Sequence, residues 1–245
     1  MKNILATCCL FAIMLMAACF PPITDPCPPA NDQLADTSLF LDEWVKENGT
    51  FKLLNIRPDF QLDYMVSDNY GLEISAGNNV LSKFGFRQES DSLYIDYAKC
   101  IRGRATVTGS LTAPEIKYFQ LAGNSAIKIE NQPLNQVFLT VNELAWFNVN
   151  TPLNRCEIDF NSTDSAYLKD SISNLVINHS GEGVIDGQLC NGQYATIDVD
   201  STGSVYLGEF EKLNVTIAGR GNVYYKGEPE IKETITGKGQ LIKLP

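Results

Sequence analysis

The chain has 245 residues and a formal net charge of −10 at pH 7. An acidic surface argues against nucleic acid as a partner, because phosphate backbones are bound by clustered lysine and arginine side chains. It also argues against charge-driven docking on anionic lipid, and the length allows one large domain or two small ones.

The first 18 residues have the features of a secretory signal peptide. Lys2 precedes an apolar run from Ile4 to Ala18 that is short for a membrane span and ends in small residues. The sequence Met16-Ala-Ala-Cys19 resembles a bacterial lipobox, in which the cysteine is acylated and becomes the first residue of the mature chain. We therefore predict lipidation at Cys19, which would hold the protein on a membrane without a transmembrane helix. The alternative is an ordinary secretory signal cleaved near Ala18.

Residues 19–36 form a proline-rich tether in this interpretation, since proline-rich stretches are extended and semi-rigid. An N-terminal β region follows at 37–112, where apolar and polar residues alternate from Phe51 onward and turn clusters separate the alternating runs. No linker of glycine and serine divides this region from residues 113–245. We therefore predict one continuous folded unit.

The last half of the chain repeats one short motif, in which two glycines flank a single residue and an alternating apolar strand follows. The steps between copies are 18 to 21 residues, too short for a propeller blade and with no room for a helix. The copies, including fainter and degenerate ones, begin at Gly123, Asn142, Thr163, Gly181, Ser201, Gly219 and Gly237.

This period predicts an all-β fold, a parallel β-helix (solenoid) over 113–245 with coils of about 18–21 residues, in which residues 37–112 form irregular early coils or a cap. We expect the repeated glycines at corners that need φ > 0. The alternative is a β-sandwich with these glycines at hairpin turns. In a β-helix, inward residues of successive coils would form a ladder that includes Ile127, Ile185, Val205, Val223 and Leu241.

Five cysteines follow the signal peptide. If Cys19 is acylated, Cys27, Cys100, Cys156 and Cys190 allow three pairings in an oxidising compartment. Their spacings fit no zinc pattern. Buried free thiols fit the sequence equally well.

Two stretches resemble a known family. Residues 213–229 and 234–239 are similar to the end of the head GIN domain family of bacterial auto-transporter adhesins, and residues 114–118 with 121–123 are similar to its mid-domain proline element. The similarity extends from about Phe51 to the C-terminus. It implies a β-helical, secreted or lipid-anchored protein of the cell envelope, and it brings no catalytic residues.

Candidates for chemistry are few. His179 is the sole histidine, and no second ligand at metal-binding spacing accompanies it, so a turn or surface imidazole is the favoured interpretation. An outward pair of carboxylates could serve a polysaccharide lyase or a glycosidase, although solvent-facing positions explain the acids as well. These acids are Glu157, Asp159, Asp164, Asp170, Glu182, Asp186, Asp198 and Asp200. We expect no catalytic site, metal or cofactor.

Tyrosines offer a binding surface. Tyr206 lies between two inward aliphatic residues and must face outward. Tyrosine rings on such a stripe could stack on sugars or anchor a protein, but tyrosine also suits solvent-facing strand positions without any ligand. The candidate binding residues are Tyr167, Tyr206, Tyr224 and Tyr225.

The sequence therefore predicts a non-enzymatic cell-envelope lipoprotein, an adhesin or scaffold that presents a rigid β-helical surface to a glycan or an extracellular protein. Its membrane anchor would be Cys19, the expected membrane is the outer one, and the leaflet stays open. The alternative function is a carbohydrate-active enzyme that uses outward carboxylates on the same fold.

Overall fold

A computed structural model describes residues 34–39, 49–57, 59–81, 84–97, 107–132 and 134–245. The signal peptide, Cys19, Cys27, Cys100 and most of the tether lie outside these residues. The described part is nearly all β-strand, and its single helix, α2 (Asn78–Leu81), has four residues. Within the same ranges no helix is both long and apolar enough to cross a bilayer.

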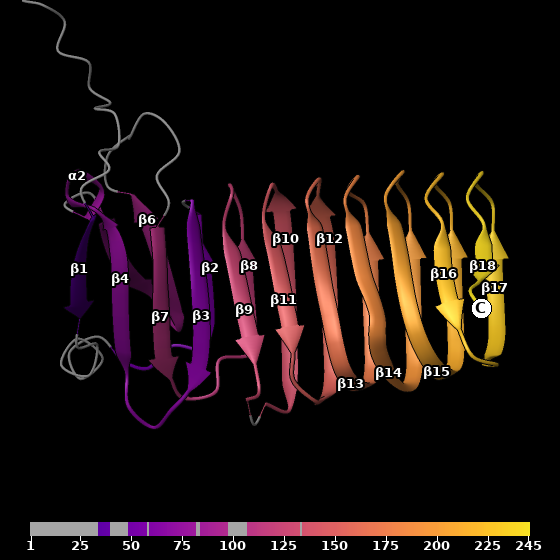
Figure 1. The fold of residues 1–245 in the computed structure, drawn as a ribbon, viewed down its shortest axis with the longest axis horizontal. Coiled ribbons are helices and arrows are strands. Elements are labelled where there is room, and N and C mark those ends of the chain that lie inside the picture. The colour runs from indigo at the N-terminus through magenta and orange to yellow at the C-terminus, as the bar shows by residue number, and fades with distance from the viewer. Residues whose placement is uncertain (1–33, 40–48, 58, 82–83, 98–106, 133) are drawn as a thin grey trace, which may run out of the picture.

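The strands lie across the long axis of an elongated molecule and are stacked side by side from one end to the other (Figure 1). Their bounds are β1 (Leu34–Leu39), β2 (Leu53–Ile56), β3 (Phe60–Val66), β4 (Gly71–Gly77), β5 (Phe84–Glu89), β6 (Ser92–Tyr97), β7 (Val107–Ala113), β8 (Tyr118–Leu121), β9 (Ala126–Glu130), β10 (Gln136–Glu143), β11 (Trp146–Asn150), β12 (Leu153–Ser162), β13 (Ser165–His179), β14 (Val184–Val199), β15 (Ser204–Ile217), β16 (Val223–Lys226), β17 (Glu230–Ile235) and β18 (Leu241–Lys243).

Two sheets of stacked strands face each other. From β8 onward every pairing is parallel, because each coil contributes one strand to each sheet and the next coil lies directly beside it. Sheet I contains β9, β11, β16, β18 and the first halves of β13–β15; sheet II contains β8, β10, β12, β17 and the second halves of β13–β15. Parallel stacking confirms the β-helix and rules out the sandwich alternative.

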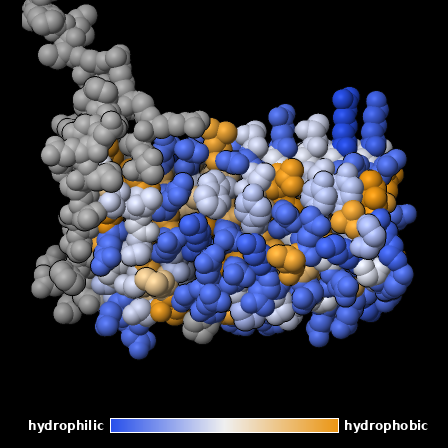
Figure 2. All heavy atoms as spheres, in the orientation of Figure 1, coloured by the Kyte–Doolittle hydropathy of each residue, from blue (hydrophilic) through white to orange (hydrophobic). Residues whose placement is uncertain are grey.

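The interior is a set of apolar ladders, one residue per coil. In sheet I, Ile185 aligns with Val205, Val205 with Val223, and Val223 with Leu241. Ile127 holds the same position further toward the N-terminus, where it aligns with Phe147. The predicted ladder is therefore confirmed. Figure 2 shows the complementary result, an outer face covered mainly by hydrophilic side chains with separate hydrophobic ones.

The corner glycines are required for a different reason from the expected one. Among the repeat markers only Gly123 has a positive φ, of 69°. Elsewhere a Cβ would collide with the coil beneath: on Gly183 it would lie 1.9 Å from Asp164 O, and on Gly221 it would lie 1.7 Å from Gly203 O. The expectation that these corners need φ > 0 therefore holds at Gly123 and is wrong at Gly181, Gly219 and Gly237. The coils stack so closely there that no side chain fits.

The register in the middle of the chain is shifted by one residue from the expected one. Strand pairing aligns Glu143 with Ser162, and Gly181 stacks on Ser162, where a Cβ would lie 2.2 Å from Ser162 O. The corners are therefore at Glu143 and Ser162, not at Asn142 and Thr163. No glycine marks either corner, so the sequence motif could not locate them.

At the N-terminal end, the spatial order of the coils departs from the sequence order. β3 lies between β7 and β9, and β2 lies between β6 and β8, all in parallel pairings. β4 pairs antiparallel with β7 and with β1, and β5 pairs antiparallel with β6. The chain thus forms an early coil with β2 and β3, adds β4–β7 on its outer side and crosses back to β8. This confirms the prediction of irregular early coils or a cap.

A buried tyrosine holds the segment that crosses back. Tyr64 Oη donates a hydrogen bond to Pro114 O at 2.9 Å and accepts one from Ile116 N at 2.8 Å. Burial raises the pKa of Tyr64 to about 12, so the hydroxyl keeps the proton that it donates. The proline element at residues 114–118 thus marks the place where the chain passes the coil of β2 and β3 on its way from β7 to β8.

The last coil carries a charge where earlier coils are apolar. All residues of β17 are exposed, and its pairing with β15 places Glu233 beside Val215 in an inward column. The same column holds Ile158, Ile177 and Ile197 in earlier coils. An inward-pointing charge on an edge strand discourages further strands from adding to the sheet.

Cys156 and Cys190 are buried free thiols. Burial raises the pKa of Cys190 to about 12 and that of Cys156 even further, so neither is a reactive thiolate. The sequence left disulfides and buried free thiols as two possible interpretations, and the second one holds for these two cysteines.

Candidate functional site

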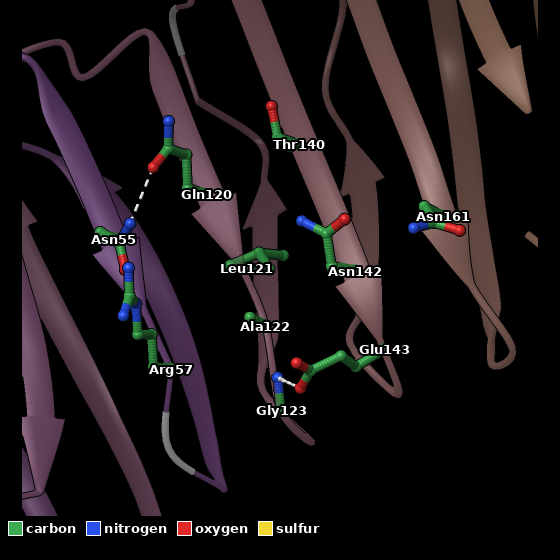
Figure 3. A pocket seen from close by; sticks show the side chains of 10 residues that line it. All are labelled: Asn55, Arg57, Gln120, Leu121, Ala122, Gly123, Thr140, Asn142, Glu143 and Asn161. Atoms are coloured by element: carbon green, nitrogen blue, oxygen red, sulfur yellow. Dashed lines mark hydrogen bonds between the residues drawn. The ribbon is translucent and has the colours of Figure 1, made fainter. Parts of the chain in front are cut away.

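A polar hollow of about 690 Å³ lies on the outer face of sheet II, over β2, β8, β10 and β12 (Figure 3). Amide side chains dominate its lining, and one arginine and one glutamate stand at its edge. We refer to it as the hollow; it is lined by Asn55, Arg57, Gln120, Leu121, Ala122, Gly123, Thr140, Asn142, Glu143 and Asn161.

Strand stacking brings these residues together from distant parts of the sequence. Asn55, Gln120 and Thr140 align in one outward column. Asn142 aligns with Asn161 in the next column toward the corner. Ala122, which follows β8, lies at the floor between the longer side chains that project around it (Figure 3). The hollow exists because a methyl group stands where the next coils carry asparagine.

Hydrogen bonds fix one side of the hollow. Asn55, which is 6% exposed, donates from Nδ2 to Gln120 Oε1 at 2.7 Å. Arg57 Nε donates to Asn55 Oδ1 at 3.3 Å. Because the Asn55 amide is held between two partners, the outward groups of Gln120 and Arg57 stand in defined positions.

Glu143 forms the opposite edge and has an unusual backbone. It has φ 63°, in the left-handed region that glycine prefers, at the corner equivalent to Gly123. Its Oε2 accepts a hydrogen bond from Gly123 N at 2.7 Å. A left-handed backbone costs a residue with a side chain about 1–2 kcal/mol, so the chain keeps a carboxylate here at a position better suited to glycine.

The predicted tyrosines occupy a different face. Tyr167, Asp186, Tyr206 and Tyr224 align in one outward column of sheet I. The rings of Tyr206 and Tyr224 stack with centroids 4.4 Å apart and an interplanar angle of 5°. Asp186 separates Tyr167 from this pair. Stacked rings turn their shared faces to each other, so the pair offers edges and hydroxyls to a ligand.

Tyr225 departs from the column. It packs against the apolar core, because it follows the outward Tyr224 and alternation turns it the other way. The other three tyrosines remain together as candidate contacts on sheet I, and their binding role stays a prediction.

His179 is a core residue, which corrects the expectation of a turn or surface imidazole. It is 2% exposed and aligns with Phe160 and Val199 in an inward column of sheet II. Nε2 lies 3.0 Å from Gly183 O and Nδ1 lies 3.0 Å from Ser201 Oγ. A neutral ring that donates from Nε2 and accepts at Nδ1 satisfies both contacts, and burial lowers the pKa of His179.

Several of the carboxylates considered for an enzyme make local contacts. Asp164 and Asp170 accept hydrogen bonds from the backbone of the following residues, Ser165 and Ser171. Glu157 forms an ion pair with Arg155 at 2.6 Å. Asp159 accepts from Asn178 at 2.7 Å, and Asn178 stands between Asp159 and Asp198 in the column.

No metal-ligating group of three or more His, Cys, Asp or Glu side chains occurs among the residues that the structure describes. Burial shifts the pKa values of Tyr64 and His179. The pKa of Tyr206 is raised by burial and by Tyr224, and the pKa of Lys212 is raised by its hydrogen bond to Glu230.

Comparison with protein families gives a decisive match. The model described as "Putative auto-transporter adhesin, head GIN domain" matches residues 50–229. The chain belongs to this family. The resemblance inferred from the terminal repeats is confirmed, and the head GIN domain covers both the irregular early coils and most of the regular ones.

Solved structures share the head GIN fold at low sequence identity. An adhesin, described as putative, from Bacteroides fragilis has a TM-score of 0.77 and 15% identity over 89% of this chain and 99% of its own. Two Parabacteroides distasonis proteins, described as a putative adhesin and a putative lipid binding protein, have TM-scores of 0.63 and 0.64 and identities of 16% and 17%. Each covers 89% of this chain, with 100% and 99% of their own chains matched. No curated protein sequence matches the chain.

The sequence did not reveal the hollow of this head GIN domain. Its residues come from four strands, and Asn55 and Asn161 are more than 100 positions apart. One signal was present: Asn142 and Asn161 are 19 residues apart, and Gln120 and Thr140 are 20 apart, so correct stacking aligns each pair. The one-residue error at the corners of these coils hid that alignment.

Proposed function

We propose that this head GIN domain protein is a non-enzymatic adhesin of the cell envelope, held on the outer membrane by lipid on Cys19. It would present the outer faces of its solenoid to a glycan or an extracellular protein. Family membership supports an adhesin role, while the lipobox-like sequence before Cys19 and the proline-rich residues after it support the anchor.

The observation that carries the proposal is the continuous strand pairing beneath the surface groups. The side chains of the hollow and the tyrosine column project from strands that are paired with a coil on each side, above a continuous apolar core. Groups held in this way lose little conformational entropy when a ligand binds. A rigid display surface suits recognition of an external partner.

Adhesion is tested by coating beads with the purified chain and measuring their retention on glycan and extracellular-matrix protein arrays. We expect retention on at least one class of surface. Alanine variants of Tyr167, Tyr206 and Tyr224 then determine whether the tyrosine column contributes. Beads that bind neither class of array would contradict the adhesin proposal.

The anchor is tested separately. Cells that express the protein are grown with radioactive or clickable palmitate, and we expect the protein to become labelled. The Cys19→Ser variant should carry no label and should leave the membrane fraction. Protease treatment of intact cells would show which leaflet carries it. Unlabelled wild-type protein would show that residues 1–18 act as an ordinary secretory signal.

A further inference from the structure

We propose that the hollow on sheet II binds a neutral glycan that lies along the long axis of the solenoid, across β2, β8, β10 and β12. The inference rests on the proposed function, because it names the ligand class and the site of the adhesive surface. It concerns a different face from the tyrosine column.

The first argument is hydrogen-bonding chemistry. Within the described residues, the side chains of Thr140, Asn142 and Asn161 have no hydrogen-bond partner although they stand together around the hollow. Each amide offers two N–H donors and one carbonyl acceptor, and a threonine hydroxyl is both donor and acceptor. Sugar hydroxyls have the same dual character. A ring of such groups matches a ligand with several hydroxyls better than a ligand that only donates or only accepts.

The second argument is charge. The hollow has one cationic side chain, Arg57, and one anionic side chain, Glu143, so its own charges balance. The whole chain carries −10, which repels polyanions at long range. The carboxylate of Glu143 would also repel an anionic group bound in the hollow. A neutral glycan avoids both penalties, while Arg57 and Glu143 can bind hydroxyl groups from opposite edges.

The third argument is shape. Four neighbouring strands line the hollow, so its length is about three strand spacings, or ~14 Å, longer than a single sugar ring. An aromatic pair lies on the same outer face, in the column next to Gln120 and Thr140: Tyr118 and Phe138 stack with centroids 4.9 Å apart. Because the rings stack on each other, they offer their edges as an apolar contact beside the polar lining of the hollow. Protein interfaces instead centre on an apolar core, which this lining lacks.

The experiment uses the full chain and an array of neutral oligosaccharides, with uronic-acid oligosaccharides and matrix proteins as comparison sets, followed by titration calorimetry on the best neutral binder. Two variants change the hollow without touching the core. Asn142→Leu removes an amide at nearly constant size, and Ala122→Leu fills the floor. The matched control is Asn214→Leu, an outward amide of sheet II on β15, remote from the hollow.

We expect both hollow variants to weaken binding of the neutral oligosaccharide at least tenfold and the control to leave it unchanged, with all three variants showing wild-type circular dichroism. The inference is overturned if both hollow variants bind the neutral oligosaccharide as tightly as wild type does, or if only uronic-acid ligands bind. If no glycan binds but matrix proteins do, the glycan inference fails and the adhesin proposal stands. If the chain binds neither glycans nor matrix proteins, both the glycan inference and the adhesin proposal are overturned.

Discussion

The imidazole of His179 leaves no room for a side chain on Gly203. A Cβ on residue 203 would lie 2.3 Å from His179 Cε1 and 2.3 Å from Gly183 O. His179 in turn is held by Gly183 O and by Ser201 Oγ. The histidine, the glycine and the corner of the coil therefore form one closely packed unit inside the solenoid.

Substitution of Gly203 by alanine tests this packing. We expect Gly203→Ala to lower the free energy of unfolding by about 1–3 kcal/mol or more, since overpacking forces the ring or the backbone to shift. Urea denaturation measures the change. Thr202→Ala, at the exposed neighbouring position, is the control and should stay within about 0.5 kcal/mol of wild type. Equal stability of the two variants would contradict the packing argument.

The buried histidine predicts a specific pH dependence. Burial lowers the pKa of His179 in the folded state, so the unfolded chain, whose histidine pKa is about 6.5, binds a proton first as the pH falls. Its contribution to stability is thus complete above about pH 6.5 and is lost as the pH falls from there through the folded-state pKa. Urea unfolding at pH 7.5 and at pH 5 measures the loss.

Because the chain has one histidine, a comparison with His179→Gln separates its titration from that of the carboxylates. His179→Gln should be less stable at neutral pH and should show a flatter profile between pH 7.5 and 5. If His179→Gln loses as much stability between pH 7.5 and pH 5 as the wild-type protein does, the titrating group is not His179.

Tyr64→Phe tests the crossing segment. Loss of the hydroxyl leaves Pro114 O and Ile116 N without their partner, and unsatisfied buried polar groups cost about 1–3 kcal/mol. We expect a lower urea midpoint with an unchanged slope. Tyr118→Phe removes a hydroxyl from an exposed ring and should leave the midpoint in place. Identical midpoints for both variants would mean that the Tyr64 hydroxyl does not stabilise the crossing.

Glu233 predicts how the C-terminal end behaves. We expect Glu233→Val to make the chain associate as its concentration rises, because the inward column of sheet II would then end in an apolar residue on an unpaired edge. Lys232→Val, on the same strand but facing outward, is the control. Sedimentation velocity over a range of concentrations measures the association. If Glu233→Val sediments like the wild-type protein, Glu233 does not prevent strands of another molecule from adding to this edge.

Residues that repeat at a fixed period could be placed from the sequence. The ladder of Ile185, Val205, Val223 and Leu241 follows directly from steps of 18 to 20 residues. The role of the glycines could not be read in the same way. A positive φ and a collision with the coil beneath select the same amino acid, and only the position of that coil separates the two causes.

Features that depend on distant pairings were not predictable. Nothing near Tyr64 indicates that its hydroxyl meets a segment 50 residues further on, or that β3 lies between β7 and β9. Likewise Glu143 gave no corner signal, since its left-handed backbone occurs without a glycine. The hollow depends on that corner, so its residues could be assembled only once the coils were aligned.

The hydrogen bonds that join successive coils run along the long axis of the molecule, since ladder bonds lie across the strands. Tension along that axis therefore pulls on these bonds along their own direction, and every coil interface between the two points of attachment carries the same force. The hollow lies over the coils nearer the N-terminal end. A pull on a ligand held there, resisted at the N-terminus, would leave the C-terminal coils free of mechanical load.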